Sequence, residues 1–101
     1  MSTIKYPMGA ADQQSKAYAA VIAATITNHL TALVIAQMTG AATLNLTVDA
    51  QMKVGAEVNI EVSADGTNRA FTPGSGMTGN AVTITASKNM LLCYYWNGTA
   101  F

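Results

Sequence analysis

Two stretches of the sequence alternate apolar and polar residues with a period of two, and this pattern constrains the fold most. Residues 42–49 read A-T-L-N-L-T-V-D, and residues 56–63 read A-E-V-N-I-E-V-S. On a β-strand, such alternation turns one face toward a hydrophobic core and the other toward water. Both stretches are therefore predicted to be half-buried strands.

Other segments extend the β pattern along the chain. Residues 82–86 alternate in the same way, and residues 90–96 form a dense apolar run that predicts a final strand. Residues 30–37 are apolar on both faces, as expected of a buried or interfacial strand. Residues 17–27 fit either a helix or a strand; we expect a strand over residues 21–27, with a preceding helical turn as the open alternative.

The turns and the ends of the chain complete the predicted organisation. Ala64–Thr67 and Trp96–Thr99 contain Asp-Gly and Asn-Gly pairs, which favour type I′ hairpins. Short strands with regular turns predict an all-β fold: a single antiparallel β-sandwich or jelly-roll-like domain over residues 17–101. Residues 1–16 contain proline, glycine and a polar run, and are predicted to be an extended N-terminal arm, either an anchor or mobile.

The composition points to association. Half of the residues are hydrophobic and only 10% are charged, whereas an ordinary domain carries roughly 25% charged residues. A domain of this size exposes much of its surface, so we expect part of it to be buried against copies of itself or a partner. The alternative is a monomer made soluble by Thr, Asn, Ser and Gln. The net charge is zero and the basic residues are scattered, so neither nucleic acid nor a membrane surface is an expected partner.

The motifs that could indicate cofactor binding or catalysis lack the sequence context or the spacing that they require. Residues 74–79 match G-x-G-x-x-G, but a predicted strand follows where a helix is required, and no acidic residue follows Asp65. Glu57 and Glu61 share one face of a strand and lie roughly 13 Å apart at its ordinary rise. Glycosidase carboxylates lie about 5 to 9.5 Å apart. We therefore predict no enzyme and no cofactor.

The single histidine and the single cysteine are also weak candidates. His29 and Cys93 lack the ligand spacing of a metal site, and one cysteine permits no internal disulfide. We expect His29 at a strand edge or turn, and Cys93 as a small buried hydrophobe. The apolar run at residues 17–26 is too short to span a membrane. Because Asp12 precedes it and the chain begins at Met1, we expect no cleaved signal peptide and synthesis in the cytoplasm.

Three aromatic residues precede the last turn. On a strand, Tyr94 and Trp96 face one way and Tyr95 the other. One interpretation is core packing combined with a contact between subunits. The other is an aromatic platform for a sugar ring, since the face of an aromatic side chain can pack against the apolar face of a sugar.

Three segments together resemble small β modules of tailed-bacteriophage virion proteins. They are T-G-A-A-T-L-N-L-T-V at residues 39–48, G-A-E-V-N-I-E-V-S-A-D-G-T at residues 55–67, and Y-W-N-G-T-A-F at residues 95–101. Such modules occur in capsid decoration proteins, head fibres and tail fibres. The resemblance covers about residues 25–101. This chain departs from the pattern at Pro73 and at Phe101, where related modules often extend the last strand.

The resemblance implies a trimeric capsid decoration, or cement, protein of the virion that stabilises the shell. Its expected partners are itself, as a homotrimer, and the major capsid protein or another virion protein. The alternative is a head- or tail-fibre module that binds host-surface carbohydrate through the aromatic C-terminal hairpin. The candidate assembly contacts are Ile4, Tyr6, Met8, Leu33 and Ile35. The candidate surface-binding aromatics are Tyr94, Tyr95 and Trp96.

Overall fold

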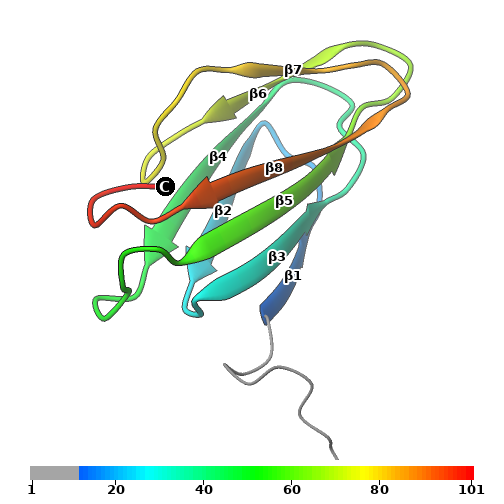
Figure 1. Cartoon of the computed structure of the whole chain (residues 1–101). Helices are drawn as coiled ribbons and strands as arrows, with labels where there is room; N and C mark the ends of the chain where they lie inside the picture. Colours follow the sequence, from blue (N-terminus) through cyan, green and yellow to red (C-terminus); the bar gives the residue numbers. More distant parts are fainter. Residues whose placement is uncertain (1–11) are drawn as a thin grey trace, which may run out of the picture.

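The computed structural model describes residues 12–101, and these form two four-stranded sheets without a helix (Figure 1). The strands are β1 (Asp12–Lys16), β2 (Val21–Ile26), β3 (Leu30–Ile35), β4 (Ala42–Val48), β5 (Glu57–Ser63), β6 (Arg69–Pro73), β7 (Val82–Ile84) and β8 (Asn89–Tyr95). The first sheet has the order β1-β3-β5-β8, and the second has the order β2-β4-β6-β7. The described chain measures 41 × 33 × 17 Å, a thickness that fits two sheets about 10 Å apart.

The chain winds between the two sheets, because every connection from β1 to β6 crosses from one sheet to the other. Strands two apart in the sequence therefore become neighbours in one sheet and run in the same direction. The strand in the opposite sheet supplies the long crossover that parallel pairing requires. The winding stops after β6. β7 then pairs antiparallel with β6, and β8 returns to pair antiparallel with β5.

The antiparallel direction predicted for the strands is wrong for four of the six strand pairings, which are parallel. Strict alternation usually marks antiparallel sheets with one face in water, whereas parallel sheets are usually covered on both faces. Here the winding covers each sheet on one face only, so its parallel strands alternate as well. The prediction of an all-β fold is confirmed.

Neither Gly pair forms the predicted type I′ hairpin. Asp65-Gly66 connects β5 to β6, which lie in different sheets, and neither residue has a positive φ. At Asn97-Gly98 only the glycine has a positive φ, of 100°, whereas type I′ requires one at both positions. In each turn the first side chain accepts a hydrogen bond from the amide two residues later, at 3.2 Å and 2.8 Å. These Asx turns reverse the chain without pairing the flanking strands.

The inward side chains of both sheets form one hydrophobic core. β4 and β5 bury the apolar faces predicted for them. β2 begins at Val21 as expected and buries Ile22, Ala24 and Ile26. Phe71 of β6 is fully buried among these residues. The period of two therefore identified the core-facing side of each of these three predicted strands.

β3 differs from its prediction as a strand with two apolar faces at an interface. Its inward residues are Thr31, Leu33 and Ile35, which are exposed by 0%, 0% and 2%. Leu33 and Ile35 were predicted as assembly contacts, and this is wrong: a side chain enclosed in the core cannot touch a partner while the domain stays folded. The outward residues of β3 are the ones available for contact, and Val34 among them is 41% exposed.

β1 lies inside the segment predicted to be an arm, residues 1–16. Residues 12–16 pair in parallel with β3, so this part of the segment belongs to the first sheet. Gln14 also ties β1 to the second sheet, because its side-chain amide donates a hydrogen bond to the carbonyl of Thr25 at 2.9 Å. Three predicted assembly contacts lie outside the described residues, namely Ile4, Tyr6 and Met8.

The Gly-rich loop after β6 packs its backbone against β4. The amide of Leu46 donates to the carbonyl of Ser75 at 2.9 Å, and the amide of Phe101 donates to the carbonyl of Gly76 at 3.0 Å. Gly76 has a φ of +78°, and a Cβ atom there would collide with the carbonyl oxygen of Leu46. This glycine thus allows close backbone approach inside the domain.

Candidate functional site

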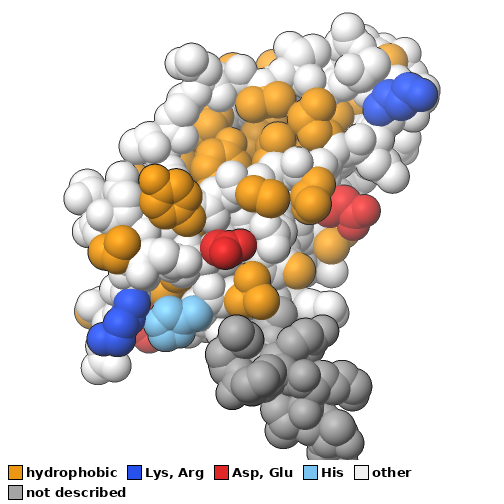
Figure 2. All heavy atoms as spheres, in the orientation of Figure 1, with side chains coloured by type: hydrophobic (Ala, Val, Ile, Leu, Met, Phe, Trp, Pro, Cys, Tyr) orange, Lys and Arg blue, Asp and Glu red, His pale blue; other side chains and the backbone are white. Residues whose placement is uncertain are grey.

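The outward face of the first sheet carries two apolar stripes on either side of a polar one. The register of β3, β5 and β8 sets their outward side chains in rows across the sheet. We call this surface the striped face; its members are Leu30, Ala32 and Val34 of β3, Glu57, Asn59 and Glu61 of β5, and Leu91, Cys93 and Tyr95 of β8. Figure 2 shows this side of the molecule, with hydrophobic side chains next to the acidic ones.

The striped face holds the most exposed apolar side chains of the first sheet. Val34 is 41% exposed, and Leu91 and Tyr95 are each 64% exposed. A single exposed hydrophobic residue is ordinary on a soluble protein. Several that share one sheet face, next to a strand edge, are typical of a surface that contacts another molecule. These exposed apolar side chains, on one sheet face beside a strand edge, make the striped face the leading candidate for a functional surface.

Two carboxylates give the striped face its only charges. Glu57 and Glu61 are both exposed and lie in the central row. Within residues 12–101 the ion pair of the structure joins Arg69 to Asp65, away from this face. No lysine or arginine is a member of the striped face. A partner that covers it must therefore bring neutral or basic groups, or leave the carboxylates at a wet rim.

The outward face of the second sheet is different in kind. The register of β2, β4, β6 and β7 places only small or uncharged side chains there, mostly threonine and alanine. Val21 is its most exposed large hydrophobic residue, at 62%. Threonine hydroxyls keep this face hydrated without charge. It is therefore a weaker candidate for a binding surface than the striped face.

A hollow of about 340 Å³ lies where the striped face meets the end of β8. It is lined by Gly55, Glu57, Cys93, Tyr94 and Tyr95. Glu57 and Tyr95 face each other across the β5–β8 pair. An exposed aromatic ring beside a carboxylate offers apolar contact and hydrogen-bond acceptors together, which is the chemistry that holds a sugar ring.

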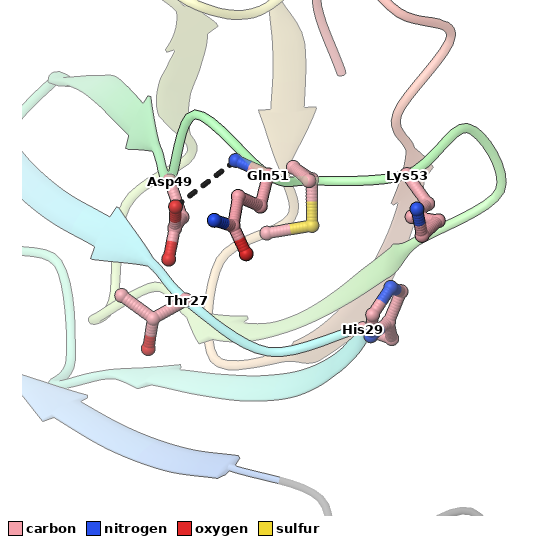
Figure 3. A pocket seen from close by; sticks show the side chains of 6 residues that line it. Thr27, His29, Asp49, Gln51 and Lys53 are labelled. Carbon is pink, nitrogen blue, oxygen red and sulfur yellow. Dashed lines mark hydrogen bonds between the residues drawn. The ribbon is translucent and has the colours of Figure 1, made fainter.

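A second hollow, of about 390 Å³, lies between two loops at the same end of the domain (Figure 3). It is lined by Thr27, His29, Asp49, Gln51, Met52 and Lys53. The carboxylate of Asp49 accepts a hydrogen bond from the amide of Gln51 at 3.0 Å, and His29 lies toward Lys53. His29 is in the turn between β2 and β3, as predicted. Within residues 12–101, no group of three His, Cys, Asp or Glu side chains can hold a metal.

The three candidate aromatics do not form one platform. Tyr94 and Tyr95 face opposite ways, as predicted, and the burial pattern of β8 shows that Tyr94 is the inward one and Tyr95 the outward one. Trp96 packs on Phe101, with ring centroids 5.3 Å apart and an interplanar angle of 53°. Burial raises the pKa of Tyr94 above its usual value near 10. Tyr95 is therefore the aromatic of the three that offers its ring at the striped face.

Cys93 was predicted to be buried, and this is wrong because it is exposed on the striped face. The run Met90–Trp96 misled the prediction, since apolar residues occupy both sides of β8. Sequence reasoning also missed Leu91 and Val34 as surface residues. The same period of two that set Tyr95 opposite to Tyr94 would have grouped Leu91 and Cys93 with Tyr95 on one face.

Comparison of the chain with protein-family models, with curated proteins and with solved structures found no match. No helix in the described part of the chain is long and apolar enough to cross a membrane. Any functional proposal must therefore come from the striped face, the two hollows and the sequence pattern themselves.

Proposed function

We propose that this chain is a non-enzymatic structural module of a tailed-phage virion, which coats the capsid shell as a homotrimeric decoration protein and stabilises it. The observation that carries the proposal is the striped face, on which Val34, Leu91 and Tyr95 leave apolar surface open to contact. The sequence pattern of residues 39–48, 55–67 and 95–101 supplies the virion context by resemblance.

The physical basis of shell stabilisation is burial of apolar surface between neighbouring subunits. Each square ångström removed from water contributes about 25 cal/mol, and association costs about 4–15 kcal/mol of lost freedom, so a stable contact buries about 800 Å² on each partner. In this proposal the striped face supplies contacts among copies. Residues 1–11 are the anchor that binds the major capsid protein or another virion protein. Neither nucleic acid nor a membrane is required.

Removal of the first eleven residues tests the anchor. The deletion spares Asp12–Lys16, so β1 and its pairing with β3 remain. We expect the shortened chain to fold and to associate as the full chain does, but to lose co-sedimentation with shells assembled from a tailed-phage major capsid protein. Full binding by the shortened chain would contradict the anchoring role. Failure of the full chain to bind any shell would contradict the virion proposal itself.

The mass of the full chain in solution tests the homotrimer. Light scattering on the purified protein should give three times the mass of one chain, because the resemblance implies a threefold assembly. A monomer at every concentration would contradict self-association, and with it the use proposed for the striped face.

A second function is favoured by the hollow beside Tyr95. A fibre-type module would bind host-surface carbohydrate there, with the exposed ring stacked on the sugar and the carboxylate of Glu57 accepting from its hydroxyls. On a glycan array, wild-type chain should bind and Tyr95→Ala should not. Leu91→Ala is the matched control, because Leu91 shares the strand, the face and the 64% exposure. Equal signals from Tyr95→Ala and wild type would exclude this site.

A further inference from the structure

The two sheets have four edge strands, and these are unequally protected. Edge strands expose unpaired backbone groups, and natural proteins guard them with charges, shortness or a covering side chain. β7 spans only three residues. β1 carries Asp12 and Lys16 on its inward side, and the amide of Gln14 covers the carbonyl of Thr25 at the edge of β2. Of the edges in residues 12–101, only β8 has none of these devices.

β8 has the composition of a strand that pairs readily. Its seven residues, Asn89–Tyr95, include no charge, no proline and no glycine. A window of six or seven residues with high β propensity and no charge is the usual signature of edge-to-edge association. The edge is therefore either satisfied by a specific partner or a site of aggregation.

The inward side of β8 is also incompletely covered. Met90, Leu92 and Tyr94 pack against the core but stay only half-buried. The second sheet ends with β7, which is four residues shorter than β8. Figure 2 shows hydrophobic side chains at the surface along this side of the molecule. A strand added beyond β8 would cover these side chains and pair the open edge in one step.

We propose that the occupant is β8 of a second copy, paired antiparallel about a twofold axis at Leu92. All seven residues find a partner only in this register, which sets Met90 opposite the partner's Tyr94 and Leu91 opposite the partner's Cys93. An isologous contact of this kind needs a self-complementary surface. The first sheet then continues from one copy into the next, and the two striped faces become one surface.

Charge favours a second copy over another protein. No charged residue meets another across the proposed pair, because β8 has none. Lys88 directly precedes β8 and would lie opposite the partner's Trp96, about eight residues, or 26 Å, along the strand from the partner's Lys88. Glu57 and Glu61 lie on β5, so those of the two copies stay about 14 Å apart across three strand spacings. That separation exceeds the Debye length of about 8 Å at physiological salt. Two copies that pair through β8 therefore do not repel each other, and the edge has no need of a charged partner strand.

The proposed contact between two β8 strands buries little surface by itself. An aromatic side chain buries about 150–250 Å², so Tyr95, at 64% exposure, offers on the order of 100 Å², and the whole edge a few hundred. Specific interfaces bury about 800 Å² on each partner. The pair should thus be weak in dilute solution and strong where copies are held side by side, as on a shell. This twofold contact is distinct from the proposed threefold one and would join a copy in one trimer to a copy in the next, so it rests on neither the trimer nor the virion role.

Cross-linking tests the contact and its register together. In the proposed pair, Leu91→Cys brings the introduced thiol opposite the partner's Cys93, with Cα atoms about 5 Å apart, inside the range that a disulfide accepts. Tyr95→Cys is the matched control, because its thiol lies about four residues, or 13 Å, along the strand from the partner's Cys93. Both variants and wild type are oxidised mildly in solution, and dimers are separated on a non-reducing gel.

We expect a covalent dimer from Leu91→Cys at a rate at least tenfold above Tyr95→Cys and wild type. Equal rates would overturn the register, and no dimer from any of the three would overturn the contact. Sedimentation over a wide concentration range adds a second readout, in which Leu91→Lys should abolish pairing and Val21→Lys, at 62% exposure on the other sheet, should not. Equal association by both lysine variants would also contradict the proposal. Shell binding is a separate assay, so loss of the virion role leaves this result standing.

Discussion

Replacement of Gly76 by alanine asks whether the loop after β6 is held against β4 by its backbone. Gly76 has a φ of +78°, and an added Cβ would collide with the carbonyl oxygen of Leu46. Gly66 is the matched control, because it has no positive φ and a Cβ atom added there would meet nothing within 4 Å. The two substitutions are chemically identical and differ only in backbone angle and available space.

The expected loss at Gly76 follows from three contributions. A left-handed backbone costs alanine roughly 1–2 kcal/mol. The loop must also move away from β4, which weakens the hydrogen bond from Leu46 to Ser75 and the one from Phe101 to Gly76; each contributes about 1 kcal/mol. We therefore expect Gly76→Ala to lower the free energy of unfolding by about 3 kcal/mol, from a total of roughly 5–15 kcal/mol for a domain of this size. Gly66→Ala should stay within about 1 kcal/mol of wild type.

Urea unfolding followed by tryptophan fluorescence measures both values. Trp96 is the only tryptophan of the chain and packs on Phe101, whose amide the loop holds. All proteins are compared at one concentration, because self-association would make stability depend on it. If Gly76→Ala loses less than about 1 kcal/mol relative to Gly66→Ala, the loop does not depend on close backbone packing and the reasoning fails.

Leu33→Ala should cost about 2–5 kcal/mol of unfolding free energy, as for a buried leucine, while Val34→Ala on the opposite face should cost less than about 1 kcal/mol; equal losses in urea would contradict the assigned faces. Arg69 holds the pKa of the Asp65 carboxyl below its usual value through a paired hydrogen bond. The stability that this bond contributes is therefore complete above the unfolded pKa of about 3.9 and is lost as pH falls through the folded one. Asp65→Asn should lower the melting temperature at neutral pH, with the difference shrinking below pH ~4; a constant difference would refute it. Because burial raises the pKa of Tyr94 above its usual value near 10, Tyr94→Phe should reduce the absorbance change above pH ~10 in an alkaline titration, and an unchanged curve there would refute this.

The period of two predicted the inside and outside of β2, β4 and β5. Residues 42–48 and 57–63 turn the expected faces to the core, and β2 begins at Val21 as expected. These faces are predictable because polar and apolar residues alternate along these strands. Dividing the dense run at the end of the chain in the same way would have grouped Leu91 with Cys93 and Tyr95, but both of its faces are apolar, so the pattern does not show which one is exposed.

The winding of the chain was not predictable from the same pattern. A turn such as Asp65-Gly66 reverses direction whether the next strand pairs with the last or crosses to the other sheet, and the Asx hydrogen bond serves both outcomes. Which strand becomes the neighbour depends on contacts between residues far apart, such as the pairing of Ala42 with Phe71. Local signals carry no information about such pairings, so the sequence predicted six of the eight strands, missed β1 and β6, and missed the strand order.

The shortage of charge that suggested association in the sequence has a definite location in the fold. β2, β3, β4, β7 and β8 contain no charged residue, whereas β1, β5 and the connecting turns carry most of those in the described chain. On the second sheet threonine replaces charge, which keeps that face hydrated. On β8 no row of threonines takes the place of charge, because Met90–Tyr95 is apolar on both sides and the edge is open. A shortage spread evenly would favour a monomer made soluble by polar side chains, but one that leaves a single long edge bare favours pairing at that edge.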